Sequence, residues 1–225
     1  MISKPASRLS FVAPWIALTT ARCAHAAAPN PSRHYAPVVH VADQRLTMHT
    51  RDGDGTLPLY ADRSIDGTAP SVTHVFIIIH GTLRNALDYF AAGKQMLAAA
   101  GARANESMIV APQFLTTLDL HVFALGRATL AWSEGGWKGG AVARRPSPVS
   151  SFSALDALLE HFGNRQLYPA LSTVMVVGHS AGAQFVRVGH DGRRMLTSAC
   201  GVAALFDRPT PAACPVASAT PPLSD

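Results

Sequence analysis

Residues 174–183 constrain what this chain can fold into more than any other stretch of the sequence. An apolar run typical of a buried strand is followed at once by Gly178-His179-Ser180-Ala181-Gly182 and then by small residues that can open a helix. Glycine on both sides of Ser180 has a steric purpose, because a serine in a strained turn brings the residues two positions away into close contact. The stretch therefore predicts a strand, a sharp turn that lifts the Ser180 hydroxyl clear of the sheet, and a helix. The alternative is an ordinary strand-to-helix turn whose serine has no chemical role.

The composition predicts one globular domain. The chain has 225 residues, of which 48% are hydrophobic and 15% charged, and this is enough to bury one sizeable core. Its formal charge of +5 is spread thinly, with Arg144-Arg145 and Arg193-Arg194 as the only adjacent basic pairs. Because no basic stripe with interleaved aromatic residues occurs, we expect no nucleic-acid partner. The sequence contains no metal-ligand cluster, phosphate loop or dinucleotide fingerprint, so we expect no metal and no cofactor.

The N-terminus has the pattern of an export signal. Lys4 and Arg8 precede an apolar segment at 9–18, and Ala24-His25-Ala26 provides small residues in an A-x-A arrangement. We therefore expect a signal peptide over 1–26 and a periplasmic or extracellular protein. The apolar segment is too short for a stable membrane span. An uncleaved anchor and a plain disordered N-terminus remain as alternatives.

The rest of the chain alternates between strand patterns and helix patterns. An alternation of this kind predicts an α/β fold with a parallel sheet and right-handed crossovers. Asp52-Gly53-Asp54-Gly55 suits a hairpin turn between two of the strands. We expect strands at 38–41, 46–50, 57–61, 72–79 and 107–111, and helices at 85–100 and 151–162.

Residues 113–149 are rich in glycine and lack a clear period, so we expect a long loop or a cap-like insertion there. Trp132 and Trp137 stand in this segment beside four glycines. Aromatic residues in loops either line a substrate pocket or pin the loop onto the core. The sequence leaves both interpretations open.

Two features together resemble the α/β-hydrolase family of serine esterases and lipases. One is the strand that ends in His80-Gly81-Thr82, and the other is the G-x-S-x-G turn around Ser180, which in this family is called the nucleophile elbow. The resemblance extends over about 38–188 and implies a mostly parallel sheet with flanking helices. We therefore expect residues 27–188 to form a partial hydrolase core.

The resemblance also implies roles for particular residues. Ser180 corresponds to the nucleophile, which forms an acyl-enzyme with a carboxylic ester or related acyl substrate, whether a small molecule, a lipid or a polymer. The backbone N–H groups of Thr82 and Ala181 correspond to the oxyanion hole. The resemblance also implies structural roles at the two turns for His80, Gly81, Gly178, His179 and Gly182.

The downstream sequence departs from the family. Members supply an acid and then a histidine after the serine, and the base needs that acid to orient it. His190 is the only histidine after Ser180, and ten residues of continuous helix would carry it about 15 Å along the axis. Asp207 is the best downstream acid, but it follows that histidine. We therefore expect impaired activity.

Our hypothesis is a truncation or a shift of reading frame near 184–190. The C-terminal strands would then be missing or disordered, and 189–225 would be an irregular tail rich in Pro and Ala. A competing interpretation is a natural short variant that uses His121 or His161 as its base. A hypothesis of another class is a non-catalytic secreted binding module that uses the loop at 132–140, or an inactive fragment.

Two cysteines would remain after removal of the signal peptide, Cys200 and Cys214. In an oxidising compartment they can pair across a short loop. Both belong to the expected irregular tail, so the pairing stays open.

Overall fold

The computed structural model describes residues 35–99, 101–188, 195–198 and 201–207. The expected signal peptide at 1–26 lies outside these residues. Seven strands form one sheet in the order β1-β2-β4-β3-β5-β7-β6. The strands are β1 (Gln44–Thr50), β2 (Gly53–Ala61), β3 (His74–Ile79), β4 (Ser107–Pro112), β5 (Thr173–Gly178), β6 (Met195–Ser198) and β7 (Gly201–Asp207).

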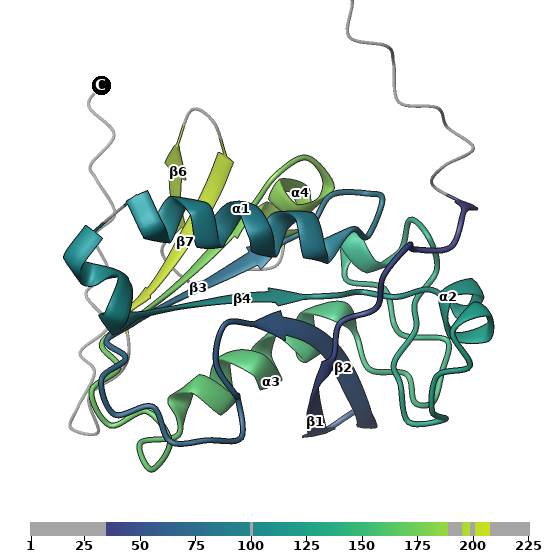
Figure 1. Ribbon diagram of the computed structural model, residues 1–225. Coiled ribbons are helices and arrows are strands. Elements are labelled where there is room, and N and C mark those ends of the chain that lie inside the picture. The colour runs from purple at the N-terminus through teal and green to yellow at the C-terminus, as the bar shows by residue number, and fades with distance from the viewer. Residues whose placement is uncertain (1–34, 100, 189–194, 199–200, 208–225) are drawn as a thin grey trace, which may run out of the picture. The chain divides into compact units, whose positions relative to one another are not determined.

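Helices flank the sheet (Figure 1). They are α1 (Ala86–Ala99), α2 (Thr117–Val122), α3 (Ser151–Gly163) and α4 (Ala181–Val188), with short 3₁₀ turns η2 (Gly101–Glu106) and η3 (Trp137–Gly139). On one face Gly93 of α1 packs against Ile78 of β3, whereas α3 covers the opposite face. None of the helices in the described part of the chain has the length and hydrophobicity of a membrane-spanning segment.

The centre of the sheet is parallel. Strand β3 pairs in parallel with β4 on one side and with β5 on the other, while β2 is antiparallel to both β1 and β4. Every residue of β4 is buried, as expected for a strand covered on both faces. The predicted α/β class, with a parallel sheet core and flanking helices, is confirmed.

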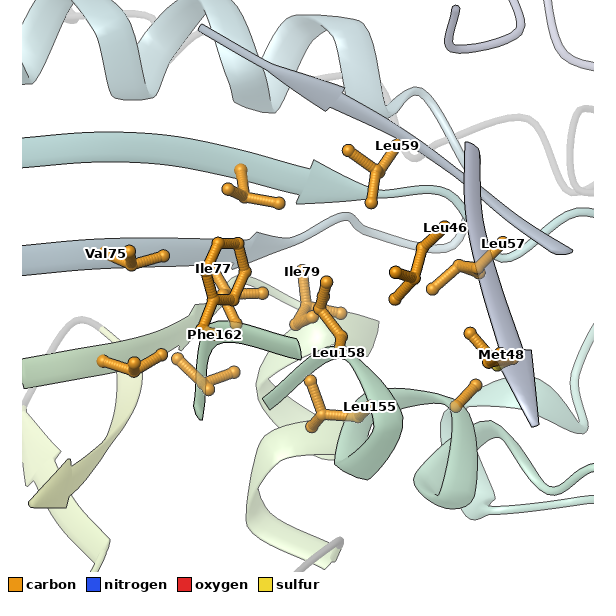
Figure 2. Packing of buried hydrophobic residues seen from close by; sticks show 14 of the residues in the cluster. Leu46, Met48, Leu57, Leu59, Val75, Ile77, Ile79, Leu155, Leu158 and Phe162 are labelled. Carbon is orange, nitrogen blue, oxygen red and sulfur yellow. The ribbon is translucent and has the colours of Figure 1, made fainter. Parts of the chain in front are cut away.

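The main core includes residues of the five strands β1 to β5, of α3 and of α4. Figure 2 shows the part where α3 packs against β1, β2 and β3. Leu155, Leu158 and Phe162 recur at helical spacing on α3 and are buried. They meet Ile77 and the other inward-facing residues of the strands, because alternate residues of a strand share one face. Each such side chain contributes about 1.5–3 kcal/mol when it is fully buried. Helix α3 begins after Ser150, whose side chain accepts the Ser153 N–H.

The expected strand at 38–41 is wrong. Side chains, and not a neighbouring strand, bond to backbone groups in this segment and directly after it. The Val38 N–H donates to Asp119 (2.8 Å), and the Ala42 N–H donates to Gln113 (2.9 Å). The predicted hairpin is present, but its two-residue turn is Arg51-Asp52 and β2 begins immediately afterwards.

The segment after α4 also differs from the expectation. We predicted an irregular tail over 189–225, and this is wrong for β6 and β7, which form an antiparallel pair. Strand β7 adds antiparallel to the outer edge of β5, where an unpaired row of backbone groups would otherwise remain. Its sequence, Gly-Val-Ala-Ala-Leu-Phe-Asp, is apolar enough for a strand. His190, Cys200 and Cys214 lie outside the described residues.

Candidate functional site

The turn between β5 and α4 has the sharp geometry that its sequence predicts. Strand β5 ends at Gly178, Ser180 has φ 56°, and α4 begins at the next residue. An L-residue in this left-handed conformation costs about 1–2 kcal/mol. The Gly182 N–H donates to the His179 carbonyl (3.0 Å) and the Gln184 N–H to the Ser180 carbonyl (3.1 Å), which closes the first turn of α4. Ser180 itself is exposed.

The two flanking glycines have no space for a side chain. A Cβ on Gly178 would lie 2.3 Å from the carbonyl group of Gly182. A Cβ on Gly182 would lie 2.3 Å from the carbonyl oxygen of Ile79, at the end of β3. The backbone of Gly178 therefore lies directly against that of Gly182, and the backbone of Gly182 lies directly against that of Ile79 in β3.

The loop after β3 leaves the sheet beside this turn. Strands β3 and β5 are parallel, and Ile79 pairs with Gly178, so the loop and the turn emerge at the same edge. Within the loop the Arg84 N–H donates to the Gly81 carbonyl (3.1 Å), which closes a tight turn around Thr82. Among the residues that the structure describes, no hydrogen bond occupies the backbone N–H of Thr82 or Ala181.

His80 is a buried structural residue at the start of that loop. Its Nδ1 lies 2.8 Å from the Gly81 carbonyl, and the Phe114 N–H donates to its Nε2 (3.0 Å). These partners assign the proton to Nδ1. Burial lowers the pKa of His80 to about 4, so the ring is neutral at pH 7. Both ring nitrogens are engaged, so this histidine is not available as a base for Ser180.

Tyr89 links the loop and the turn, and it was not predicted from the sequence. Its hydroxyl oxygen approaches so closely that a Cβ on Gly81 would lie 2.6 Å from it. The same oxygen lies 3.5 Å from Nδ1 of His179. Burial raises the pKa of Tyr89, opposed by a hydrogen bond from the Gly81 backbone. The only signal in the sequence was its position in the first turn of α1, directly after the loop.

A buried polar cluster behind the loop was also missed. It consists of Arg84, Gln113, Thr116 and Asp119. The one local signal was Thr116-x-x-Asp119, a capping-box pattern that starts α2 inside the expected loop at 113–149. The pairing of Arg84 with Asp119 joins residues 35 positions apart, which no local pattern indicates.

Trp132 and Trp137 pin the segment at 113–149 onto the core, which favours the packing interpretation over a substrate pocket lined by them. Both are completely buried. Trp137 stacks on Phe114, with the ring centroids 5.3 Å apart and the planes 6° from parallel. Trp132 donates from Nε1 to the Val149 carbonyl (3.2 Å). Burying these large rings is more favourable than leaving them at a surface.

The upstream histidines do not pair with Ser180. Nε2 of His161 lies 3.0 Å from the Ile65 carbonyl, and burial lowers the pKa of this histidine. His161 belongs to the last turn of α3, which leads to the start of β5, whereas Ser180 follows the end of β5. His121 is exposed on α2. Among the described residues, no hydrogen bond joins any histidine to the Ser180 hydroxyl.

Asp207 lies at the wrong end of the sheet to orient a base for Ser180. Strand β7 is antiparallel to β5, and Asp207 pairs with Thr173, the first residue of β5. A strand of this length separates its two ends by about 17–20 Å. Strand direction therefore excludes Asp207 as the acid. The described residues also contain no group of three side chains arranged to hold a metal ion.

No family model and no curated protein matches the chain. The solved structures that are similar to it include three hydrolases. Poly(aspartic acid) hydrolase-1 from Sphingomonas sp. KT-1 is 19% identical with a TM-score of 0.40, over 64% of this chain and 49% of that chain. XC6422 from Xanthomonas campestris, an α/β serine hydrolase without a lid, is 16% identical with a TM-score of 0.32, over 68% and 58%. The siderophore hydrolase EstB from Aspergillus nidulans is 18% identical with a TM-score of 0.33, over 68% and 52%. The chain thus spans about half the length of the structures it matches.

Proposed function

We propose that this chain derives from a serine hydrolase of the α/β-hydrolase type that acts on a carboxylic ester or a related acyl substrate. The observation that carries the proposal is the exposed Ser180 at φ 56°, in a tight turn between a central parallel strand and the first residue of a helix. A strained serine in this position presents its hydroxyl above the edge of the sheet, where a substrate carbonyl can approach. Strain of this kind persists where the surroundings enforce it, and it is concentrated at functional sites.

The chemistry would proceed through an acyl-enzyme on Ser180. Its Oγ bonds to the carbonyl carbon, the C–O bond of the ester breaks, and the alcohol leaves with the proton of the serine hydroxyl. Water then adds to the acyl carbon, which releases the carboxylic acid and returns a proton to Ser180. The N–H groups of Thr82 and Ala181 would bind the oxyanion, and the N-terminus of α4 adds partial positive charge. One such donor is worth about 10²–10³ in rate.

We further propose that turnover is impaired. Neither His80, His161 nor Asp207 is placed to form an acid–histidine pair with Ser180. Sites that lack members of the triad retain only a residual acceleration of about 10³–10⁴ over water, from the oxyanion hole and binding. We also propose export through the signal pattern at 1–26. The alternative of a binding module built on Trp132 and Trp137 loses its support, because both rings are buried.

The test is covalent labelling of the purified full chain with a fluorophosphonate, followed by intact mass and peptide mapping. Because no described histidine activates the hydroxyl, we expect slow labelling that reaches one adduct per chain, located on Ser180, and none in Ser180→Ala. The matched control is Ser172→Ala, which removes an exposed serine hydroxyl at the amino end of β5. With p-nitrophenyl acetate we expect acylation to outpace release. Equal labelling of Ser180→Ala and the wild-type chain, or no labelling of the folded wild-type chain, would show that the proposal is wrong.

A further inference from the structure

Two opposite charges are paired in the interior behind the Ser180 turn and the loop beside it. Arg84 and Asp119 are 1% and 0% exposed. The guanidinium makes two contacts with the carboxylate, from Nε to Oδ2 (2.9 Å) and from Nη2 to Oδ1 (3.2 Å). This fork geometry fixes the direction of the arginine side chain as well as its position.

The carboxylate of Asp119 is satisfied from every side. Oδ1 also accepts the Val38 N–H (2.8 Å), and Oδ2 accepts the N–H and the hydroxyl of Thr116 (2.7 and 2.8 Å). Burial alone would raise the pKa of Asp119, but Arg84 and the backbone donors hold it below its usual value. Through the Val38 N–H, the segment before β1 contacts Asp119 of α2. The negative charge of Asp119 is therefore held in one place by Val38, Arg84 and Thr116, which come from three separate parts of the chain.

Arg84 is held at its backbone too. Its φ is 58°, and a residue other than glycine keeps this conformation only where its surroundings enforce it. Its carbonyl accepts Nε2 of Gln113 (2.9 Å) and the Ala86 N–H (3.0 Å). Its own N–H closes the turn onto the Gly81 carbonyl. The side chain and the backbone of Arg84 are thus both anchored at the end of the turn that contains Thr82.

A buried ion pair is weak evidence for stability, because apolar residues of similar volume do the same work at lower desolvation cost. What the fork adds is a fixed geometry. An oxyanion donor must be held within about 0.5 Å of its productive position, and a loop without an anchor does not hold it. We infer that Arg84 and Asp119 are positioning residues that orient the Thr82 N–H for the oxyanion of the acyl substrate. This inference rests on the proposed function.

The test measures binding of phenylboronic acid to the full chain. Oγ of Ser180 bonds to the trigonal boron, and its proton is released to solvent. The product is an anionic tetrahedral boronate with one boron-bound oxygen in the oxyanion hole, and it does not turn over. We expect Arg84→Met to weaken binding by about 100-fold, the lower end of the cost of losing one oxyanion donor. Arg84→Lys keeps the positive charge but loses the two-point contact with Asp119. Its affinity for the boronate should therefore lie between those of the wild-type chain and Arg84→Met. All proteins are compared at a temperature where circular dichroism shows them folded.

The matched control is Arg63→Met. The Nη2 of Arg63 donates to the carbonyls of Asn105 and Ser107 at the opposite edge of the sheet, so its loss should lower stability and leave boronate affinity unchanged. A second variant, Arg84→Met with Asp119→Leu, replaces the pair by apolar residues and should fold even if the single variant does not. It should still bind the boronate weakly.

The outcomes separate the two proposals. Wild-type affinity in the folded Arg84→Met chain or in the double variant overturns the positioning role while the proposed function stands. An equal loss of affinity in Arg63→Met overturns it as well, because the effect would then follow stability. If the wild-type chain neither binds the boronate nor labels at Ser180, both proposals fall.

Discussion

Replacing Gly182 by alanine should destabilise the protein by about 2 kcal/mol. The new Cβ would lie 2.3 Å from the Ile79 carbonyl oxygen, where ordinary contact begins at 3.4 Å, so α4 and β3 must separate by about 1 Å. The atoms in conflict are backbone, and β3 is paired on both sides, so the clash cannot be relieved by a side-chain rotation. Overpacking of a tight site costs typically 1–3 kcal/mol, and the upper end applies here. Alanine has a higher helix propensity than glycine, which offsets about 1 kcal/mol of this cost.

The assay is urea unfolding followed by the fluorescence of the buried Trp132 and Trp137. The control is Gly163→Ala at the end of α3, where an added Cβ meets nothing within 4 Å. We expect that variant to be neutral or slightly stabilised, by at most about 1 kcal/mol. A Gly182→Ala chain as stable as Gly163→Ala would refute the argument, because the close approach of α4 to β3 would then not exist in solution.

Two further predictions concern titration and core packing. The pKa of His80 is about 4 when folded and 6.5 as the ordinary value, so below pH 6.5 the unfolded chain binds a proton that the folded chain does not. Stability should therefore fall by roughly 3 kcal/mol between pH 6.5 and 4, and an NMR titration in which this ring protonates near 6.5 would contradict it. Leu158→Ala should cost about 2–5 kcal/mol in urea unfolding, because Leu158 is fully buried in the core under β3. Val142→Ala, at a side chain that is 56% exposed, should change stability by at most about 0.5 kcal/mol, and equal losses in the two variants would contradict the packing argument.

Most of the sheet and its helices follow from local pattern. The apolar runs at 72–79 and 107–111 predicted two central strands, which the structure has as β3 and β4. The helical stripe at 151–162 predicted α3 within one residue. These elements are predictable because the spacing of their apolar residues identifies the helix or strand and its buried face, whichever segment packs against it.

The segments that were mispredicted depend on partners distant in the sequence. Residues 38–41 are apolar enough for a strand, but their backbone bonds to the side chains of Asp119 and Gln113. A tryptophan in a glycine-rich loop has the same sequence signature whether it faces solvent or the core. Trp137 packs against the rings of His80, Phe114 and Phe185, which are distant from it in the sequence. Likewise the Ser180 turn could be predicted from five residues, whereas the Arg84–Asp119 pair behind the neighbouring loop could not.

Strand direction decides what the C-terminal segment can contribute to Ser180, and an apolar run carries no direction. In a parallel sheet, residues that follow the next strand would emerge at the edge where Ser180 lies. Strand β7 runs the other way, so its first residues pair near Gly178, with Val202 opposite it, and its last residue, Asp207, pairs with Thr173. An acid placed after this strand is therefore delivered to the far edge, however suitable its side chain. The order of acid and histidine in the sequence raised the doubt about catalysis, and the reversed strand gives that doubt a geometric cause.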